Sequence, residues 1–168
     1  EAVLFGQRRK SLRVEPAPEA LQEFLAWRYD GKGGFRRDAP VLKTSDFRTA
    51  AARLVNVSGG GLGLTVRAAL AGERELDLAV GQRCIIHYLL REPRVPGRHE
   101  FWLVARIRHH AFDHCGQCLV YGLEFLASGC LDAKAGKIRW EPVADHAIPE
   151  LADICYLWHL DRHRERLG

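Results

Sequence analysis

The sequence AARLVNVSGGGLGLTV, at positions 51–66, decides the fold. It contains two apolar runs rich in strand-forming residues, 51–57 and 62–66, and Gly59, Gly60 and Gly61 stand between them. Glycine adopts the backbone conformations that tight turns require. This stretch therefore predicts two strands joined by a tight turn.

Further strands are predicted downstream of this turn. Residues 84–90 form an apolar run, and residues 100–108 alternate so that one face carries Phe101, Leu103, Ala105 and Ile107. Alternate residues of a strand share a face, so this face is predicted to be core. Strand character resumes over 118–125 after a polar stretch that includes a glycine, which predicts a hairpin connection over 109–117. The middle of the chain is thus predicted to be an antiparallel meander.

The two ends of the chain show different patterns. Residues 14–29 fit a helix or one face of a strand, and a polar, glycine-rich loop is predicted over 31–45. From Pro149 onward apolar residues recur at helical spacing, which predicts one amphipathic helix carrying Leu151, Ile154, Cys155 and Trp158 on one face. Runs of strands followed by one helix favour a small β-barrel or a sandwich over a parallel α/β sheet.

Composition restricts the class of protein. The chain has 168 residues, of which 47% are hydrophobic and 27% charged, as expected for one globular domain. Its net charge of +4 is small, so an anion site must come from local clustering. No apolar stretch approaches the roughly 20 residues of a membrane span and no secretory leader opens the chain, so we expect a cytoplasmic protein with reduced cysteines. Methionine is absent, so we expect that Glu1 is not a translational start and that a domain precedes it.

Two short motifs carry the functional signal. The first is Arg9-Lys-Ser-Leu-Arg13, preceded by Arg8, and the second is Asn56-Val-Ser-Gly-Gly-Gly61. Arginine presents a planar fork of donors that suits phosphate oxygens or the O6/N7 edge of guanine. Asn56 and Ser58 offer short polar groups, while the glycines leave backbone N–H groups accessible. Together the motifs suit a guanine-bearing phosphate ligand, although singly they are also typical of a solvated basic tail and a simple turn.

The two motifs resemble the signature of the PilZ family of cyclic di-GMP receptors, an arginine-x-x-x-arginine arm with an (Asp or Asn)-x-Ser-x-x-Gly turn. The resemblance continues in Gly61-Leu-Gly-Leu64, Ala105-Arg-Ile-Arg108 and Tyr121-Gly-Leu-Glu-Phe125. It implies a mainly β fold, a six-stranded antiparallel PilZ-like β-barrel with a C-terminal α-helix, in which residues 21–29 form the first strand. Three segments follow from it: an interdomain arm over 1–13, a barrel over 14–146 with an inserted loop near 31–45, and a helix over 147–168.

The resemblance also implies a function, that of a receptor for the bacterial second messenger cyclic di-GMP. Seven residues of the two motifs would bind this ligand: Arg8, Arg9, Arg13, Asn56, Ser58, Gly60 and Gly61. Binding would order the arm over the barrel rim, because several charge-assisted hydrogen bonds outweigh the entropy cost of ordering a short segment. The ordered arm would then reposition a neighbouring domain or partner.

The wider role is implied by a further resemblance. Gln7-Arg8-Arg9 resembles the interdomain linker of the flagellar-brake subgroup, which implies an upstream domain and a protein partner in motility or secretion machinery. This resemblance also implies that the protein controls motility, biofilm formation or exopolysaccharide production. We expect neither a cofactor nor enzymatic activity, since the sequence has no hydrolase elbow, phosphate-loop lysine or zinc-protease pattern.

Three alternatives remain open. A Cys-x-x-Cys pair with nearby imidazoles has the ligand chemistry of zinc, and the residues concerned are His110, His114, Cys115 and Cys118. The basic run 8–13 together with an exposed Trp102 would suit a barrel that binds single-stranded nucleic acid. The terminal helix would suit a homodimer, because Leu151, Ile154, Leu157 and Trp158 offer more apolar surface than packing on one barrel face needs to bury. Packing of the helix on its own barrel is the simpler interpretation.

Overall fold

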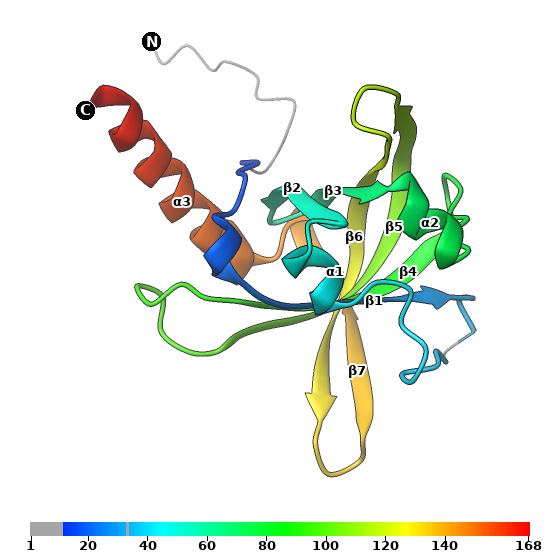
Figure 1. Cartoon of the computed structure of the whole chain (residues 1–168). Coiled ribbons are helices and arrows are strands. Elements are labelled where there is room, and N and C mark those ends of the chain that lie inside the picture. Colours follow the sequence, from blue (N-terminus) through cyan, green and yellow to red (C-terminus); the bar gives the residue numbers. More distant parts are fainter. Residues whose placement is uncertain (1–11, 33) are drawn as a thin grey trace.

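The computed structural model describes residues 12–32 and 34–168, and its main feature is one curled antiparallel sheet beside a long C-terminal helix (Figure 1). The strands are β1 (Leu21–Tyr29), β2 (Ala52–Ser58), β3 (Gly61–Arg67), β4 (Arg83–Leu90), β5 (His99–Asp113), β6 (Cys118–Asp132) and β7 (Lys137–Pro142). The helices are α1 (Thr44–Arg48), α2 (Ala68–Glu73) and α3 (Pro149–Leu167), with 3₁₀ turns at Pro18–Ala20 and Ala144–His146. In this part of the chain no helix is long and apolar enough to cross a bilayer.

Six strands form a continuous antiparallel path in the order β1-β4-β5-β6-β3-β2. This path curls into a half-barrel, which confirms the predicted mainly β fold with a C-terminal helix. The two end strands are each joined by an isolated bridge to a connecting segment, Val57 of β2 to Val14 and Ala26 of β1 to Leu42. Val14, which follows the first motif directly in the sequence, therefore lies beside β2.

The sequence did not predict β7. This strand pairs with residues 127–132 of β6, beyond the part of β6 that pairs with β3, and the β6–β7 hairpin projects away from the half-barrel (Figure 1). Among the described residues, no strand pairs with the other edge of β7. Its residues Lys137, Arg139 and Glu141 are exposed, whereas Ile138 and Trp140 are half-buried.

The predicted connection over 109–117 is wrong, because β5 continues to Asp113 and only residues 114–117 form the turn before β6. His110 lies opposite Tyr121 and Phe112 lies opposite Leu119 in this extension of the ladder. Residues 109–113 are all exposed and do not alternate between polar and apolar, so they gave no strand signal, yet the backbone pairing does not depend on such alternation. By contrast, β1 spans Leu21–Tyr29 and confirms the strand predicted for that stretch.

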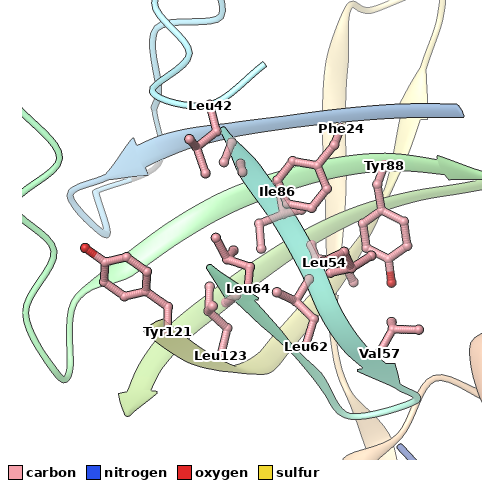
Figure 2. Packing of buried hydrophobic residues seen from close by; sticks show 14 of the residues in the cluster. Phe24, Leu42, Leu54, Val57, Leu62, Leu64, Ile86, Tyr88, Tyr121 and Leu123 are labelled. Carbon is pink, nitrogen blue, oxygen red and sulfur yellow. The ribbon is translucent and has the colours of Figure 1, made fainter. Parts of the chain in front are cut away.

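The core lies inside the curled sheet. Phe101, Leu103, Ala105 and Ile107 are all buried there, as their alternation predicts. Figure 2 shows further members of the same cluster, with aliphatic side chains from β2, β3 and β4 gathered between the strands. At about 25 cal/mol per Å² of apolar surface buried, this burial is the main stabilising contribution.

The terminal helix α3 packs on the chain's own sheet. Leu151, Ile154, Cys155 and Trp158 are buried and belong to the same core cluster as the strands. This confirms the apolar face expected from the i, i+3, i+4, i+7 spacing. A homodimer through this helix stays a prediction.

The outer face of the sheet carries a second, smaller apolar cluster around Trp27, Ile85 and Val104. Trp102 belongs to it and stacks on Trp27, with ring centroids 5.7 Å apart and planes 14° from parallel. The His87 ring lies 4.3 Å away, and the Trp102 indole nitrogen is buried. The expected exposure of Trp102 is therefore wrong, since neighbouring rings already cover the surface that would have stacked on a base.

Candidate functional site

The β2–β3 turn holds the second motif in a fixed position. The Ser58 hydroxyl accepts the Gly60 N–H and donates to the Gly61 carbonyl oxygen, both over 3.3 Å, so this side chain stabilises its own turn. The Gly60 carbonyl oxygen accepts the Phe125 N–H at 2.9 Å, which ties the turn to β6. On the other side, the Ile148 N–H donates to the Gly59 carbonyl oxygen at 2.8 Å, which ties the turn to the start of α3.

Two glycines are required by the close approach of their neighbours. A Cβ at Gly61 would overlap the backbone carbonyl of Leu123, so a side chain there would break the pairing of β3 with β6. A Cβ at Gly63 would lie 2.9 Å from Nδ2 of Asn56, because the Asn56 side chain lies across Gly63. The motif asparagine therefore rests on a strand surface that lacks side chains.

Arg13, the last residue of the first motif, is placed beside this turn. The Val14 N–H donates to the Val57 carbonyl oxygen at 3.0 Å and the Val57 N–H donates back to Val14 at 2.8 Å. The side chain of Arg13 is exposed. Arg8 and Arg9 lie outside the described residues.

The next residue, Glu15, connects the same segment to the rest of the fold. Its carboxylate accepts hydrogen bonds from Arg53 of β2 and, at 3.3 Å, from Arg162 of α3. The hydrogen bond from Arg53 is the largest of the contributions that lower the pKa of Glu15. The segment that carries Arg13 is thereby joined to both β2 and α3.

An open cleft of about 630 Å³ lies between the β2–β3 turn, β6 and the outer part of β5. Five of the predicted site residues line it together: Arg13, Asn56, Ser58, Gly60 and Gly61. Its volume falls within the range of small-molecule sites, about 300–1,000 Å³. Arg13, the last residue of the first motif, thus meets the second motif at one concave surface, although the two are far apart in the sequence.

The sequence interpretation missed the opposite wall of the cleft, formed by Arg108, His109 and Glu124, and also His146. The Glu124 Oε2 atom lies 3.1 Å from Nη2 of Arg106 and 3.3 Å from Nε of Arg108. The alternation over residues 100–108 placed both arginines on the face opposite the core, but the position of this face beside the second motif follows only from the pairing of β5 with β6 and of β6 with β3.

The zinc alternative is not supported. In residues 12–32 and 34–168, no three His, Cys, Asp or Glu side chains are placed to hold a metal ion. The His110 ring stacks on Tyr121 at 4.8 Å, and the Cys118 thiol donates to the Gly116 carbonyl oxygen at 3.1 Å. These side chains interact with their nearest neighbours at the β5–β6 turn rather than with a common centre.

A second polar cluster, which we call the helix anchor, joins α3 to the loop between β4 and β5. It consists of Glu92, Arg94, His99, Glu150, Trp158 and Asp161. Glu92 is buried and accepts from both Arg94 (2.7 and 2.8 Å) and the Trp158 indole N–H (2.9 Å). The Arg94 hydrogen bonds are the main reason that the pKa of Glu92 falls to about 2.

His99 is the buried histidine of the helix anchor, and an acceptor faces each of its ring nitrogens. Nδ1 lies 2.7 Å from a Glu150 carboxylate oxygen, and Nε2 lies 2.8 Å from the Val95 carbonyl oxygen. Only an imidazolium can donate from both nitrogens at once. Burial would lower the pKa of His99, but these hydrogen bonds outweigh it and the pKa is raised.

The fold resembles that of a motility inhibitor. The solved structure of the Bacillus subtilis Inhibitor of motility (MotI/DgrA) is similar to this chain, with a TM-score of 0.55 and 15% sequence identity. The similarity covers 92% of this chain and 53% of that one, so this chain spans about half the length of the motility inhibitor. At this identity the similarity shows the fold alone. No family model and no curated protein matches the chain.

Proposed function

We propose that this protein is a non-enzymatic receptor for cyclic di-GMP that acts in the cytoplasm. The observation that carries the proposal is the cleft, where Arg13 of one motif meets Asn56, Gly60 and Gly61 of the other. The resemblance to the PilZ family predicted this meeting from two short motifs. A fold shared with a motility inhibitor supports the same proposal, although the similarity extends to the fold alone.

The chemistry of the cleft suits the proposed ligand. Cyclic di-GMP carries two phosphates and two guanines, so it needs cations and groups that match the edges of a base. Arg13 and Arg108 supply cations to the cleft, and Asn56 supplies an amide with both donor and acceptor atoms. Arg8 and Arg9 are proposed to add further contacts from the arm.

The arm is proposed to act as the switch. Ordering a short segment costs about 1–2 kcal/mol per residue, and each charge-assisted hydrogen bond contributes about 1.5–3 kcal/mol. Several arginine contacts could therefore hold the arm over the cleft only while the ligand is bound. The ordered arm would reposition an upstream domain or a protein partner and so regulate motility, biofilm or exopolysaccharide production.

Calorimetric titration with cyclic di-GMP tests the proposal. We expect the wild-type protein to bind, and we expect Arg13→Ala and Arg9→Ala each to weaken binding about 10- to 100-fold, the equivalent of one lost charged hydrogen bond. Arg139→Ala is the matched control, because Arg139 is exposed on β7, outside the cleft lining. It is expected to bind like the wild type.

The proposal would be overturned if the wild-type protein failed to bind cyclic di-GMP. It would also be overturned if both Arg13→Ala and Arg9→Ala bound cyclic di-GMP as tightly as the control. Thermal unfolding of each variant shows whether a loss of binding reflects a loss of fold, and Arg13→Lys separates charge from geometry, since lysine keeps the charge without the planar fork.

A further inference from the structure

Glu124 faces the cleft from the side opposite Asn56. It lies on β6, directly across from Gly61 of β3 and from Arg106 of β5. Gly61 has no side chain, so nothing from β3 stands in front of the Glu124 carboxylate at that position. About a third of this side chain (32%) is exposed.

The two neighbouring arginines orient this carboxylate. Arg106 Nη2 and Arg108 Nε both contact the same oxygen, Oε2, at 3.1 and 3.3 Å. Among the described residues, Oε1 has no hydrogen-bond partner. A carboxylate can accept about four hydrogen bonds, so this one keeps acceptor capacity on a fixed side chain.

The acceptor-only character of a carboxylate distinguishes guanine from adenine. The Watson–Crick edge of guanine presents two adjacent donors, N1–H and the N2 amino group, and both carboxylate oxygens can accept from them. Adenine presents the N6 amino donor beside the N1 lone pair, so one carboxylate oxygen would face another acceptor. An unmatched acceptor pair in a cleft is repulsive and excludes the wrong ligand.

We propose that Glu124 makes the cleft selective for guanine over adenine, by accepting from the Watson–Crick edge of a bound guanine while Arg106 and Arg108 hold its carboxylate in place. This inference rests on the proposed binding of a cyclic dinucleotide. The inference names the residue that selects the base. This residue, Glu124, belongs neither to the arginine motif at 9–13 nor to the turn motif at 56–61.

Titrations of the wild type and Glu124→Gln with cyclic di-GMP and with cyclic di-AMP test the inference. The glutamine amide presents one donor and one acceptor, a pattern that suits adenine and mismatches guanine. We therefore expect the variant to bind cyclic di-GMP at least about tenfold more weakly than the wild type and cyclic di-AMP more tightly. The ratio of the two affinities should then be smaller in the variant than in the wild type. Glu124→Ala should weaken only the binding of cyclic di-GMP.

The matched control is Glu141→Gln, because Glu141 is an exposed carboxylate on β7 outside the cleft lining. Failure of the wild type to bind either dinucleotide would overturn the proposed function and this inference together. If the wild type binds cyclic di-GMP but Glu124→Gln keeps the same ratio of affinities, or loses both ligands equally, this inference is wrong and the proposed function stands. Thermal unfolding of Glu124→Gln and Glu124→Ala confirms that the compared proteins are folded.

Discussion

The cleft and the helix anchor are both rich in charged side chains, but they differ in how these groups are paired. In the anchor, both oxygens of Glu92 accept from Arg94, and each nitrogen of His99 faces an acceptor. In the cleft, the Glu124 contacts fall on one oxygen, and Arg13 and Asn56 line an open volume of about 630 Å³. A polar cluster that satisfies itself stabilises the fold, whereas a cluster with spare capacity beside open space can bind a ligand.

The largest effect is expected from removing the buried carboxylate of the anchor. Glu92→Ala leaves the Trp158 indole N–H without its acceptor and the Arg94 guanidinium with Asp161 alone, so we expect the free energy of unfolding to fall by about 3 kcal/mol. Urea unfolding measures this change. Where the variant is folded, calorimetric titration should give an unchanged affinity for cyclic di-GMP.

Glu141→Ala is the control for this prediction, because Glu141 is exposed and lies outside the anchor. Its free energy of unfolding should change by less than about 0.5 kcal/mol. A Glu92→Ala variant as stable as this control would show that the pairing within the anchor contributes nothing to stability. The proposed difference between a stabilising anchor and a ligand-binding cleft would then be wrong.

A smaller effect is expected at Gly59, where the motif turn contacts α3. A Cβ there would lie 3.1 Å from the Ala152 Cβ and 3.3 Å from the Ile148 carbonyl oxygen. Gly59→Ala should therefore cost about 2 kcal/mol in thermal or urea unfolding, as overpacking does elsewhere. It should also weaken ligand binding, because the displaced turn belongs to the cleft.

The control at this position is Gly72→Ala on α2, where an added Cβ has nothing within 4 Å. Replacing a helical glycine by alanine should stabilise the protein by about 0.5–1 kcal/mol. Equal effects of the two substitutions on stability would contradict the tight packing of the turn on α3.

The smallest effect is a pH dependence that distinguishes the anchor from the cleft. The pKa of His99 is raised above its ordinary 6.5, so its contribution is fully present below about pH 6.5 and is lost as pH rises through the folded-state value. We expect a loss of about 1 kcal/mol, the net value of one hydrogen bond, in urea unfolding measured between about pH 6 and pH 9. His99→Gln should remove most of this slope.

His159→Gln is the control, because His159 lies on the same helix with an exposed side chain. Its pH profile should match that of the wild type. A wild-type stability that rises over this pH range, or the same slope in His99→Gln, would show that the imidazolium is not what stabilises the anchor.

Much of the fold could be predicted from the sequence because most strands have one apolar face. β1 and β4 are apolar on both faces, and β1 shows why periodicity alone was ambiguous there. Phe24 and Ala26 face the inner core, while Leu25 and Trp27 belong to the outer cluster, so both faces of the strand are apolar. A strand buried on both sides has no alternation of period two, and only the family resemblance favoured a strand over a helix.

The candidate site was predictable only where a motif is local in sequence. Asn56, Gly60 and Gly61 sit on one turn, so their spacing identified them. Glu124 and Arg108 reach the cleft through the pairing of β6 with β3 and β5, and that register depends on long-range contacts that no short motif encodes. β7 was missed although Lys137, Ile138, Arg139, Trp140 and Glu141 alternate between charged and apolar side chains, a strand signal that could have found it.

Within the part of the chain that the structure describes, one edge of β7 pairs with no other strand, and charged side chains stand along this strand. An unpaired strand edge can add a strand from another molecule, and proteins commonly prevent this with lysine, arginine or proline at the edge. The exposed side chains of Lys137, Arg139 and Glu141, followed by Pro142, fit that description. A strand from another molecule would have to bury these charges in order to pair here, which disfavours the addition of a strand at this edge.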